Sequence, residues 1–500
     1  MQLHRSHYLL ALFITISAIL GLLRFNSLQL GTSYDDAHYI ILAESLSSGQ
    51  GYQLINFPRP QIERAFPPGW PLLLTPLTFV FPGNYAILKF LSLLLSLASI
   101  VLTYNLFAKR LSSPYPEILT GLVALNPLLV GTSVTVMSES AYLFFSLLAL
   151  YLFDKWRDAT DSRRNWLILF VCMLAFYTQL IRTIGISLFV ALVLYLLFTR
   201  RFRETVIATA VFVAGTLLQG WLSGSLISSG YQTQVFNSAI IEKTSQMLAN
   251  ALGYFNETAA GSLLPVFGAR LTSMLGSYGL QWLPFILNLV ILLPVMLGMF
   301  RRRNDIQLAD VYFIIYIIGM LAFWNPRVGS VKARFLIPIL PFLYFYFLRG
   351  LSLLTKNNAR IAYAVSIVIA CTLLARNLQD WRSPFMNQMT DLSMGAAWVA
   401  ENAPRDAIVM VNEPVPAYVH VRRKTINFPK QGQELNKYLD NQGIDFIIIA
   451  PPLQSPRSTE LEPAIRSRIL PILEADPDTF SIVYSNPEYN VMVYRYNGGQ

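Results

Sequence analysis

Residues 33–71, SYDDAHYIILAESLSSGQGYQLINFPRPQIERAFPPGWP, connect the first two long apolar runs of the chain. Two adjacent carboxylates, Asp35 and Asp36, follow the first run directly and so lie at the end of a membrane helix rather than within it. The connector ends in a Pro-Pro-Gly-Trp-Pro motif at residues 67–71. One Asp here is most simply a helix cap, but a carboxylate pair at a membrane boundary marks the connector as a candidate functional site.

The residues after the carboxylates predict a short helix. Apolar residues within 37–46 recur at roughly helical spacing, which favours an amphipathic helix along the membrane surface. Ser33 or Asp35 can cap its first turn, and Gly49 and Gly51 can end it.

The composition is that of a membrane protein. Hydrophobic residues make up 54% of the chain, charged residues only 13%, and the mean hydropathy is +0.46. Soluble domains carry about twice that share of charge. Apolar runs close to the spanning length of about 20 residues predict a polytopic α-helical protein with about 11 transmembrane helices. The predicted spans are residues 8–27, 86–108, 117–136, 141–156, 166–181, 184–199, 205–224, 279–299, 308–324, 335–353 and 360–376.

The net charge of +10 does not indicate nucleic-acid binding, because most Lys and Arg residues cluster between the predicted spans. Their distribution indicates the orientation of the chain in the membrane instead. The two long connectors, 31–85 and 225–278, are poor in Lys and Arg for their length. The positive-inside rule therefore places the N-terminus in the cytoplasm and both long connectors outside. The first run has a basic start and no cleavage site, which indicates an uncleaved anchor in the inner or plasma membrane.

Cysteine and histidine patterns predict no metal, cofactor or disulfide framework. Cys172 and Cys371 both fall inside apolar runs, and no HExxH or CxxC spacing occurs.

From about Arg376 the composition becomes that of a soluble domain. Candidate helices alternate with short apolar runs, which predicts a small α/β extracytoplasmic domain over 377–500 after a transmembrane domain over 1–376. The candidate helices are 392–402, 432–442 and 459–474, and the candidate strands are 407–411, 446–450, 480–485 and 490–496.

With this orientation, charged residues from well-separated helices share the outer membrane face. They are Asp35, Asp36, Lys89, Glu139, Arg182, Arg327, Lys332 and Arg334. Charges near hydrocarbon are costly unless they pair or face a polar cavity. The alternative is that each reaches the interface independently. Asn126-Pro127 and the prolines 338 and 341 are interpreted as helix breaks.

A site of this composition suits one kind of chemistry. A carboxylate can take a proton from an attacking hydroxyl, and Arg or Lys can stabilise a departing phosphate. Because the site lies at lipid level, a substrate can keep a hydrocarbon tail in the bilayer, as a lipid-phosphate-linked group donor does.

Several stretches, in this order, resemble the GT-C superfamily of polyprenyl-phosphate-sugar glycosyltransferases, in particular its protein-mannosyltransferase-like and aminoarabinose-transferase-like branch. They are Tyr34 to Tyr39, Gly49 to Tyr52, Phe66 to Pro71, Asn126-Pro127, Ser138-Glu139, Arg182-Thr183, Arg334-Phe335 and Ala396 to Asn402. The sequence Arg64-Ala65-Phe66 departs from the Lys-Pro-Pro form of the aminoarabinose branch.

The resemblance implies an inverting sugar transfer on the outer face, from an undecaprenyl- or dolichyl-phosphate donor to a lipid, glycan or protein. It implies an essential acid at Asp35 or Asp36 and a second acid at Glu139. It also implies phosphate contacts from three bases and candidate substrate contacts from four other side chains. The three bases are Arg182, Arg334 and Lys89, and the four side chains are Tyr34, His38, Glu63 and Trp70. The aromatic belt at the membrane boundary is enough to explain Trp70, and sugar stacking is the alternative. Some relatives bind a divalent metal, but the ligand set here is too sparse to predict one.

Two other classes of function stay open at this point. A transporter or flippase of a lipid-linked or small anionic substrate would show paired repeats and polar groups at mid-depth, and no internal repeat is apparent. A membrane-anchored binding module acting through residues 377–500 would leave the charges near the membrane unexplained.

Overall fold

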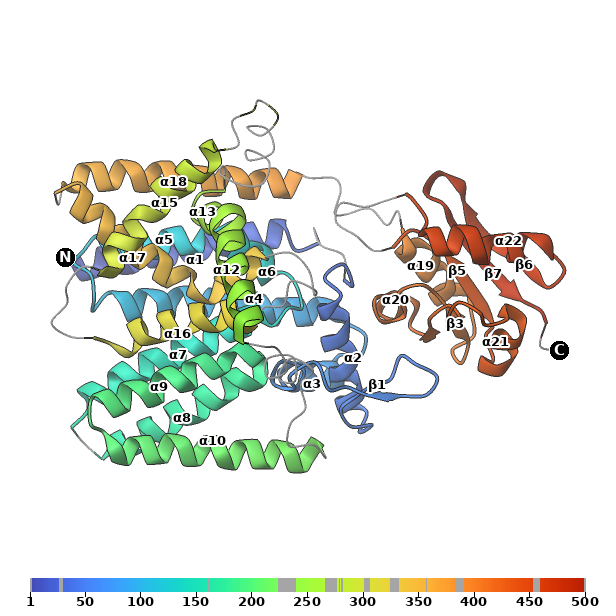
Figure 1. Cartoon of the computed structure of the whole chain (residues 1–500), viewed down its shortest axis with the longest axis horizontal. Coiled ribbons are helices and arrows are strands. Elements are labelled where there is room, and N and C mark those ends of the chain that lie inside the picture. Colours follow the sequence, from blue (N-terminus) through green and yellow to red (C-terminus); the bar gives the residue numbers. More distant parts are fainter. Residues whose placement is uncertain are drawn as a thin grey trace.

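The computed structural model describes residues 2–26, 30–160, 162–223, 240–265, 277, 279, 282–300, 306–323, 332–356, 358–382, 391–452 and 459–498. Figure 1 shows a bundle of long helices with a smaller α/β unit beyond one end, on the side where α2 and β1 lie.

Helices form nearly all of the first part of the chain. Their bounds are α1 Gln2–Leu23, α2 Asp35–Ser47, α3 Gly69–Val80, α4 Tyr85–Phe107, α5 Tyr115–Ala124, α6 Pro127–Ser133, α7 Glu139–Asp158, α8 Arg163–Ile181, η1 Thr183–Gly185, α9 Ile186–Phe198, α10 Phe202–Ser223, α12 Ile240–Gly253, η2 Tyr254–Ala259, α13 Ala260–Leu263, α15 Leu283–Phe300, α16 Leu308–Phe323, η4 Ala333–Ile339, α17 Leu340–Leu354 and α18 Ala359–Arg382. Within the described residues seven helices are long and apolar enough to cross a membrane. Each of the eleven predicted spans contains a helix or a broken helix, so the chain is a multi-pass membrane protein.

The predicted break at Asn126-Pro127 separates α5 from α6. The Asn126 side chain caps α6 by accepting a hydrogen bond from the amide of Leu128 (3.0 Å). Its amide group donates to the carbonyl of Ser262 (2.7 Å) and to the Tyr344 hydroxyl (3.0 Å). The polar groups freed by the break are thus satisfied inside the bundle, as a membrane interior requires.

The connector between α1 and α4, which is the first outer connector in the predicted orientation, contains α2, a two-stranded antiparallel hairpin and α3. The hairpin strands are β1 Gln53–Leu54 and β2 Gln61–Ile62. The predicted helix is present as α2, but every residue from Asp36 to Ala43 is buried, so it has no exposed polar face. It lies between the bundle and the α/β unit and is covered from several sides by α3 and α20 (Figure 1). The predicted cap is wrong, since no side chain caps its first turn.

The C-terminal unit is an α/β/α sandwich around a five-stranded sheet of order β4-β3-β5-β7-β6. Strand β3 is parallel to β4 and β5, whereas β7 is antiparallel to β5 and β6. Its strands are β3 Ile408–Met410, β4 Lys424–Ile426, β5 Phe446–Ile449, β6 Phe480–Asn486 and β7 Val491–Tyr496, and its helices are α19 Leu392–Asn402, α20 Pro414–Val421, α21 Leu435–Gln442, η6 Ile465–Ile469 and α22 Leu470–Ala475.

Alternate side chains of the strands enter two separate cores, as strand geometry dictates. Val409 and Ile448 pack with α19 on one face, and Met410 and Ile447 pack with α21 on the other. The predicted helices and strands are all present, and sequence reasoning missed α20, β4 and the 3₁₀ helix η7 Pro487–Tyr489. Helix α18 continues to Arg382, past the predicted division at residue 376.

The α/β unit is docked on the first outer connector by hydrogen bonds. The amide of Thr425 donates to the carbonyl of Asn56 (2.7 Å), and the Asn56 side chain donates to the Thr425 hydroxyl (3.2 Å). His420 donates to the carbonyl of Leu30 (2.7 Å), and Arg422 lies over the Tyr85 ring, 4.8 Å from its centroid. The α/β unit therefore contacts the segment that contains Asp35, and it does so on the side of that segment that faces away from the bundle.

Candidate active site

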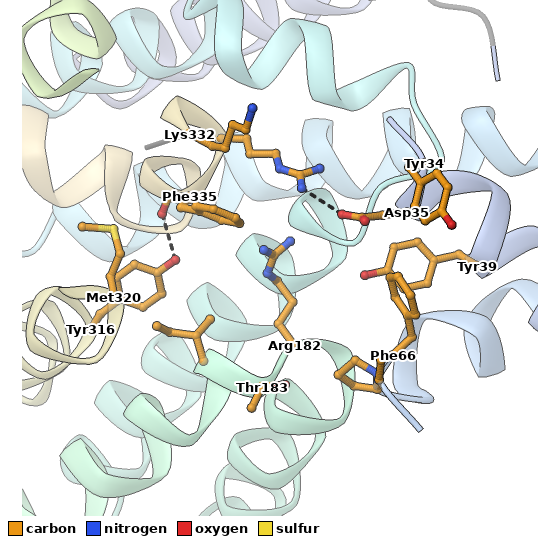
Figure 2. A pocket seen from close by; sticks show the side chains of 14 residues that line it. Tyr34, Asp35, Tyr39, Phe66, Arg182, Thr183, Tyr316, Met320, Lys332 and Phe335 are labelled. Atoms are coloured by element: carbon orange, nitrogen blue, oxygen red, sulfur yellow. Dashed lines mark hydrogen bonds and ion pairs between the residues drawn. The ribbon is translucent and has the colours of Figure 1, made fainter. Parts of the chain in front are cut away.

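A cavity of about 390 Å³ lies where α2 meets the ends of α8 and α16 and the start of η4 (Figure 2). Its lining combines one carboxylate, three cations, several aromatic rings and a few small or apolar groups. The lining residues are Tyr34, Asp35, Tyr39, Ala65, Phe66, Pro67, Arg182, Thr183, Ile184, Tyr316, Met320, Lys332, Arg334 and Phe335.

Two ion pairs organise the charges. Nη2 of Arg334 lies 2.8 Å from Oδ2 of Asp35 at the cavity surface. Nη1 of Arg182 lies 2.7 Å from Oε1 of Glu139, whose side chain is fully buried. Nε of Arg334 is 3.7 Å from the same Glu139 oxygen, so one carboxylate faces both guanidinium groups. Four side chains from four distant segments thus form a single charged cluster.

The Phe335 ring contacts both guanidinium groups. The central carbons of Arg182 and Arg334 each lie 5.3 Å from its ring centroid, a distance at which the ring attracts a cation. The Tyr316 hydroxyl donates to the carbonyl of Phe335 (2.8 Å) and fixes this segment against α16. In Figure 2 the ring lies beside Arg182, with Lys332 above it.

Short turns place Glu139 and Arg182. Glu139 is the first residue of α7, where the positive end of the helix favours a carboxylate. Arg182 follows the last residue of α8 in an extended conformation. The hydroxyl of Ser138 accepts from Arg182 (3.1 Å) and lies 3.2 Å from the Tyr39 hydroxyl. The two turns are therefore linked to each other and to α2.

The Pro-Pro-Gly-Trp-Pro motif packs against both of these turns. A side chain at Gly69 would collide with the backbone of Leu180 and Ile181, at 2.6 and 2.7 Å, so only glycine lets α3 lie this close to the end of α8. The indole N–H of Trp70 donates to the carbonyl of Val136 (3.1 Å), three residues before Glu139. Trp70 is fully buried and does not line the cavity, so the predicted sugar-stacking position is wrong.

The structure separates the two adjacent carboxylates. Tyr34 has a positive φ of 61°, uncommon for a non-glycine residue, and α2 begins at the next residue. Asp35 then points into the cavity, whereas Asp36 is buried beneath it and accepts a hydrogen bond from the amide of Gly31 (2.9 Å). Of the two candidates for the essential acid, only Asp35 can touch a molecule bound in this cavity.

The burial of Asp36 has a measurable consequence. Loss of solvent raises the pKa of Asp36 from 3.8 to about 6. Between about pH 4 and pH 6 the folded chain holds a proton that the unfolded chain has released, so stability increases as the pH falls through this window. We expect the melting temperature of the purified protein to show this rise and Asp36→Asn to lack it. At pH 7 the ionised Asp36 costs at most about 3 kcal/mol. The same slope in both proteins would contradict this account of Asp36.

Three further predicted site residues do not line the cavity: Lys89, His38 and Glu63. Lys89 is buried against the end of α1, where Nζ donates to the carbonyl of Phe25 (3.2 Å) and lies over the Phe25 ring. This placement corrects the predicted phosphate contact of Lys89. His38 stacks on Phe66 with centroids 4.4 Å apart, and burial lowers the pKa of its imidazole. Glu63 accepts from the backbone amides of Ala65 and Phe66.

Tyr34 does line the cavity and is half exposed. Arg327 lies outside the described residues.

Sequence reasoning did not assign roles to several residues that shape the site: Tyr39, Ser138, Tyr316 and Phe335. Tyr39 and Phe335 stand beside predicted residues in the quoted motifs, and that adjacency was a usable signal. Tyr316 lies inside the apolar helix α16, where a tyrosine carries no distinguishing pattern.

The fold and site define a multi-pass membrane protein with a charged cavity at the end of its bundle. No protein-family model and no curated protein matches the chain. Solved structures do match. The oligosaccharyltransferase of Archaeoglobus fulgidus, in complex with Zn and sulfate, is 15% identical, with a TM-score of 0.56 over 87% of this chain and 67% of its own. ArnT from Cupriavidus metallidurans, bound to undecaprenyl phosphate, is 12% identical, with a TM-score of 0.56 over 97% of both chains.

Both of these proteins are GT-C superfamily glycosyltransferases. The chain therefore has the GT-C fold, which confirms the predicted fold class, including the small α/β unit.

The zinc in the oligosaccharyltransferase structure raises the question of a metal here. Within the described part of the chain, no three His, Cys, Asp or Glu side chains come together as a metal site would need. Both carboxylates of the cluster are engaged by arginines instead. These residues do not fit a metal.

Proposed function

We propose that the protein is an inverting glycosyltransferase that moves a sugar from a polyprenyl-phosphate donor to a hydroxyl of an extracytoplasmic acceptor. One observation carries the proposal: Asp35, Arg182 and Arg334, which are remote in sequence, line one cavity at the end of a GT-C bundle. Figure 2 shows Asp35 and Arg182 facing this common space.

The cations suit the lipid-phosphate part of the donor. Arg182 and Arg334 both contact the Phe335 ring and the Glu139 carboxylate and both line the cavity, so their guanidinium groups can bind oxygens of one phosphate. The structural neighbour ArnT is bound to undecaprenyl phosphate, which supports a donor of this kind. Apolar residues such as Ile184 and Met320 also line the cavity, and the first isoprene units can lie against them.

The carboxylate of Asp35 suits the acceptor. In an inverting transfer the acceptor oxygen bonds to the anomeric carbon of the sugar as the bond from that carbon to the phosphate oxygen breaks. Asp35 takes the acceptor proton, and the electron pair of the broken bond stays on the phosphate, where Arg182 and Arg334 stabilise it. The products are the glycosylated acceptor and polyprenyl phosphate.

Glu139 acts through other residues. It is fully buried, does not line the cavity, and contacts both guanidinium groups. We therefore assign it as the positioning residue that keeps Arg182 and Arg334 aimed at the phosphate, rather than as a group that touches substrate. The Ser138 hydroxyl accepts a hydrogen bond from Arg182 and lies within hydrogen-bond distance of the Tyr39 hydroxyl. This chain of contacts links the ion pair of Arg182 and Glu139 to α2.

The cavity lies on the extracytoplasmic side in the orientation proposed from the basic clusters, with the N-terminus in the cytoplasm. Residues 1–376 then form the transferase domain, and residues 377–500 form an outer domain docked on the connector that carries Asp35. Lipid, glycan and protein hydroxyls all suit as acceptors.

Turnover in detergent tests the proposal. Purified protein, radiolabelled undecaprenyl-phosphate hexoses and an envelope extract containing lipids, glycans and proteins are expected to give free undecaprenyl phosphate and a labelled acceptor. A transporter or flippase would change nothing, because detergent micelles have no compartments. Intact donors after incubation with folded protein would contradict the proposal.

A further inference from the structure

We infer that His420 of the α/β unit is a positioning residue for Asp35. Its side chain binds the backbone turn that directs the Asp35 carboxylate into the cavity, so the α/β unit belongs to the catalytic arrangement. The inference rests on the proposed function, in which Asp35 is the base. His420 lies on α20, on the side of the α/β unit that faces α2 (Figure 1).

The backbone immediately before α2 makes a strained turn. The amide of Asp35 donates to the carbonyl of Ser33 (2.7 Å), and Tyr34 between them has a φ of 61° and a ψ of −49°. These features define a γ-turn with positive φ, which is rare and strained for a residue that has a side chain. Such a conformation persists only where its surroundings hold it. Because Asp35 is the next residue, the direction of its side chain depends on this turn.

The peptide group between Leu30 and Gly31 is held from both sides. Its carbonyl lies 2.7 Å from Nε2 of His420, and its N–H donates to the Asp36 carboxylate (2.9 Å). A carbonyl oxygen only accepts, so Nε2 of His420 carries the hydrogen. Two hydrogen bonds on one peptide group polarise and strengthen each other. The carbonyl of Gly31 accepts from the amide of Tyr34 (2.9 Å), and this bond joins the peptide group to the γ-turn.

The other end of α2 is held by helices of the bundle. The Thr78 hydroxyl of α3 donates to the carbonyl of Ala43 (3.2 Å), and the Tyr85 hydroxyl of α4 donates to Glu44 (2.9 Å). Loss of the His420 contact is therefore expected to leave α2 in place and to release the turn before it.

Transfer kinetics in detergent test the inference. His420→Leu removes the N–H donor and keeps a side chain of similar size. The rate with saturating undecaprenyl-phosphate hexose is expected to fall about 10- to 100-fold, since a displacement of about 1 Å in an active site can cost that much. Binding of undecaprenyl phosphate should change little, because Arg182 and Arg334 keep their contacts with Glu139. A general loss of structure would reduce both quantities.

Three control variants make the test specific to one hydrogen bond. His420→Gln places an N–H close to the position of Nε2 and is expected to recover most of the rate. Thr425→Val removes another hydrogen bond of the same interface, the one from Asn56 (3.2 Å), and should keep the rate of the original protein. Asp36→Asn keeps an acceptor for the amide of Gly31, so it should not reproduce the loss.

Tyr34→Gly tests whether His420 acts through the turn. Glycine adopts positive φ without a steric penalty, so the turn no longer has to be held against strain. His420→Leu is therefore expected to lower the rate by a smaller factor in the Tyr34→Gly background than in the original protein. Because the two factors are compared as a ratio, any loss that Tyr34→Gly causes by itself cancels.

The outcomes separate the inference from the proposed function. If the original protein transfers sugar and His420→Leu does so at the same rate, the inference is overturned and the proposed function stands. The inference is also overturned by an equal loss in Thr425→Val, by no recovery in His420→Gln, by an undiminished factor in the Tyr34→Gly background, or by a parallel loss of carrier binding. If the original protein leaves the donor intact, the proposed function fails together with the inference.

Discussion

Asp35→Asn is expected to lower kcat for sugar transfer by about 10²–10⁴-fold, the usual contribution of a general base. The amide can still accept the hydrogen bond that Arg334 now donates to Asp35 at 2.8 Å, so the cavity keeps its shape. It cannot take a proton from the acceptor hydroxyl. Binding of undecaprenyl phosphate should change little, and the loss should appear in kcat with the melting temperature preserved. Detergent turnover and carrier binding on the same preparation measure both quantities.

Asp36→Asn is the matched control for this prediction. Asp36 is the same residue type one position further along α2, but it lies beneath the cavity and faces Gly31. The variant should keep most of the transfer activity. Loss of transfer in Asp36→Asn with activity retained in Asp35→Asn would reverse the assignment of the base. Full activity in both would leave the mechanism without a base.

The choice between these two carboxylates shows where sequence reasoning stops. Adjacent residues on a helix point about 100° apart, so the two carboxylates cannot both point straight into one cavity, and in the structure one of them faces it. Which one does depends on where α2 begins, and that is set by the positive φ of Tyr34 and by the α/β unit that covers α2. Neither feature has a local signature, and the sequence left both residues open for that reason.

The fold was easier to predict, because hydropathy and periodicity are local. All eleven predicted spans contain helices, and the alternating pattern of the tail predicted most of its helices and strands. Helix α20 was missed because its sequence, PVPAYVHV, carries two prolines and three valines, which resemble a loop or strand. Proline is tolerated in the first turn, and burial against α2 supplies the remaining stability.

The errors within the site have a common cause. Trp70 and Lys89 stand near the outer boundary in sequence, where an aromatic ring or a cation is as compatible with a binding site as with packing. In the structure Trp70 donates a hydrogen bond to the turn that precedes Glu139, and Lys89 donates one to the segment that follows α1. Their contacts are with Val136 and Phe25, which are distant in the chain, so only the tertiary arrangement distinguishes the two roles.

Arg182→Met is expected to damage both stability and carrier binding. The substitution removes the 2.7 Å partner of Glu139 and leaves a fully buried carboxylate with Arg334 at 3.7 Å as its nearest remaining cation. Breaking a buried ion pair from one side typically costs about 3–5 kcal/mol. The melting temperature should therefore fall clearly, and binding of undecaprenyl phosphate should weaken because one of its proposed guanidinium contacts is lost.

The double variant Arg182→Met with Glu139→Gln separates these two effects. Neutralising Glu139 removes the buried charge, so the melting temperature should return towards that of the original protein. Carrier binding should stay weak, since the phosphate contact proposed for Arg182 is still missing. Recovery of binding together with stability would show that Arg182 serves only to neutralise Glu139, and the phosphate role would then pass to Arg334 and Lys332, the cavity cations that both variants retain.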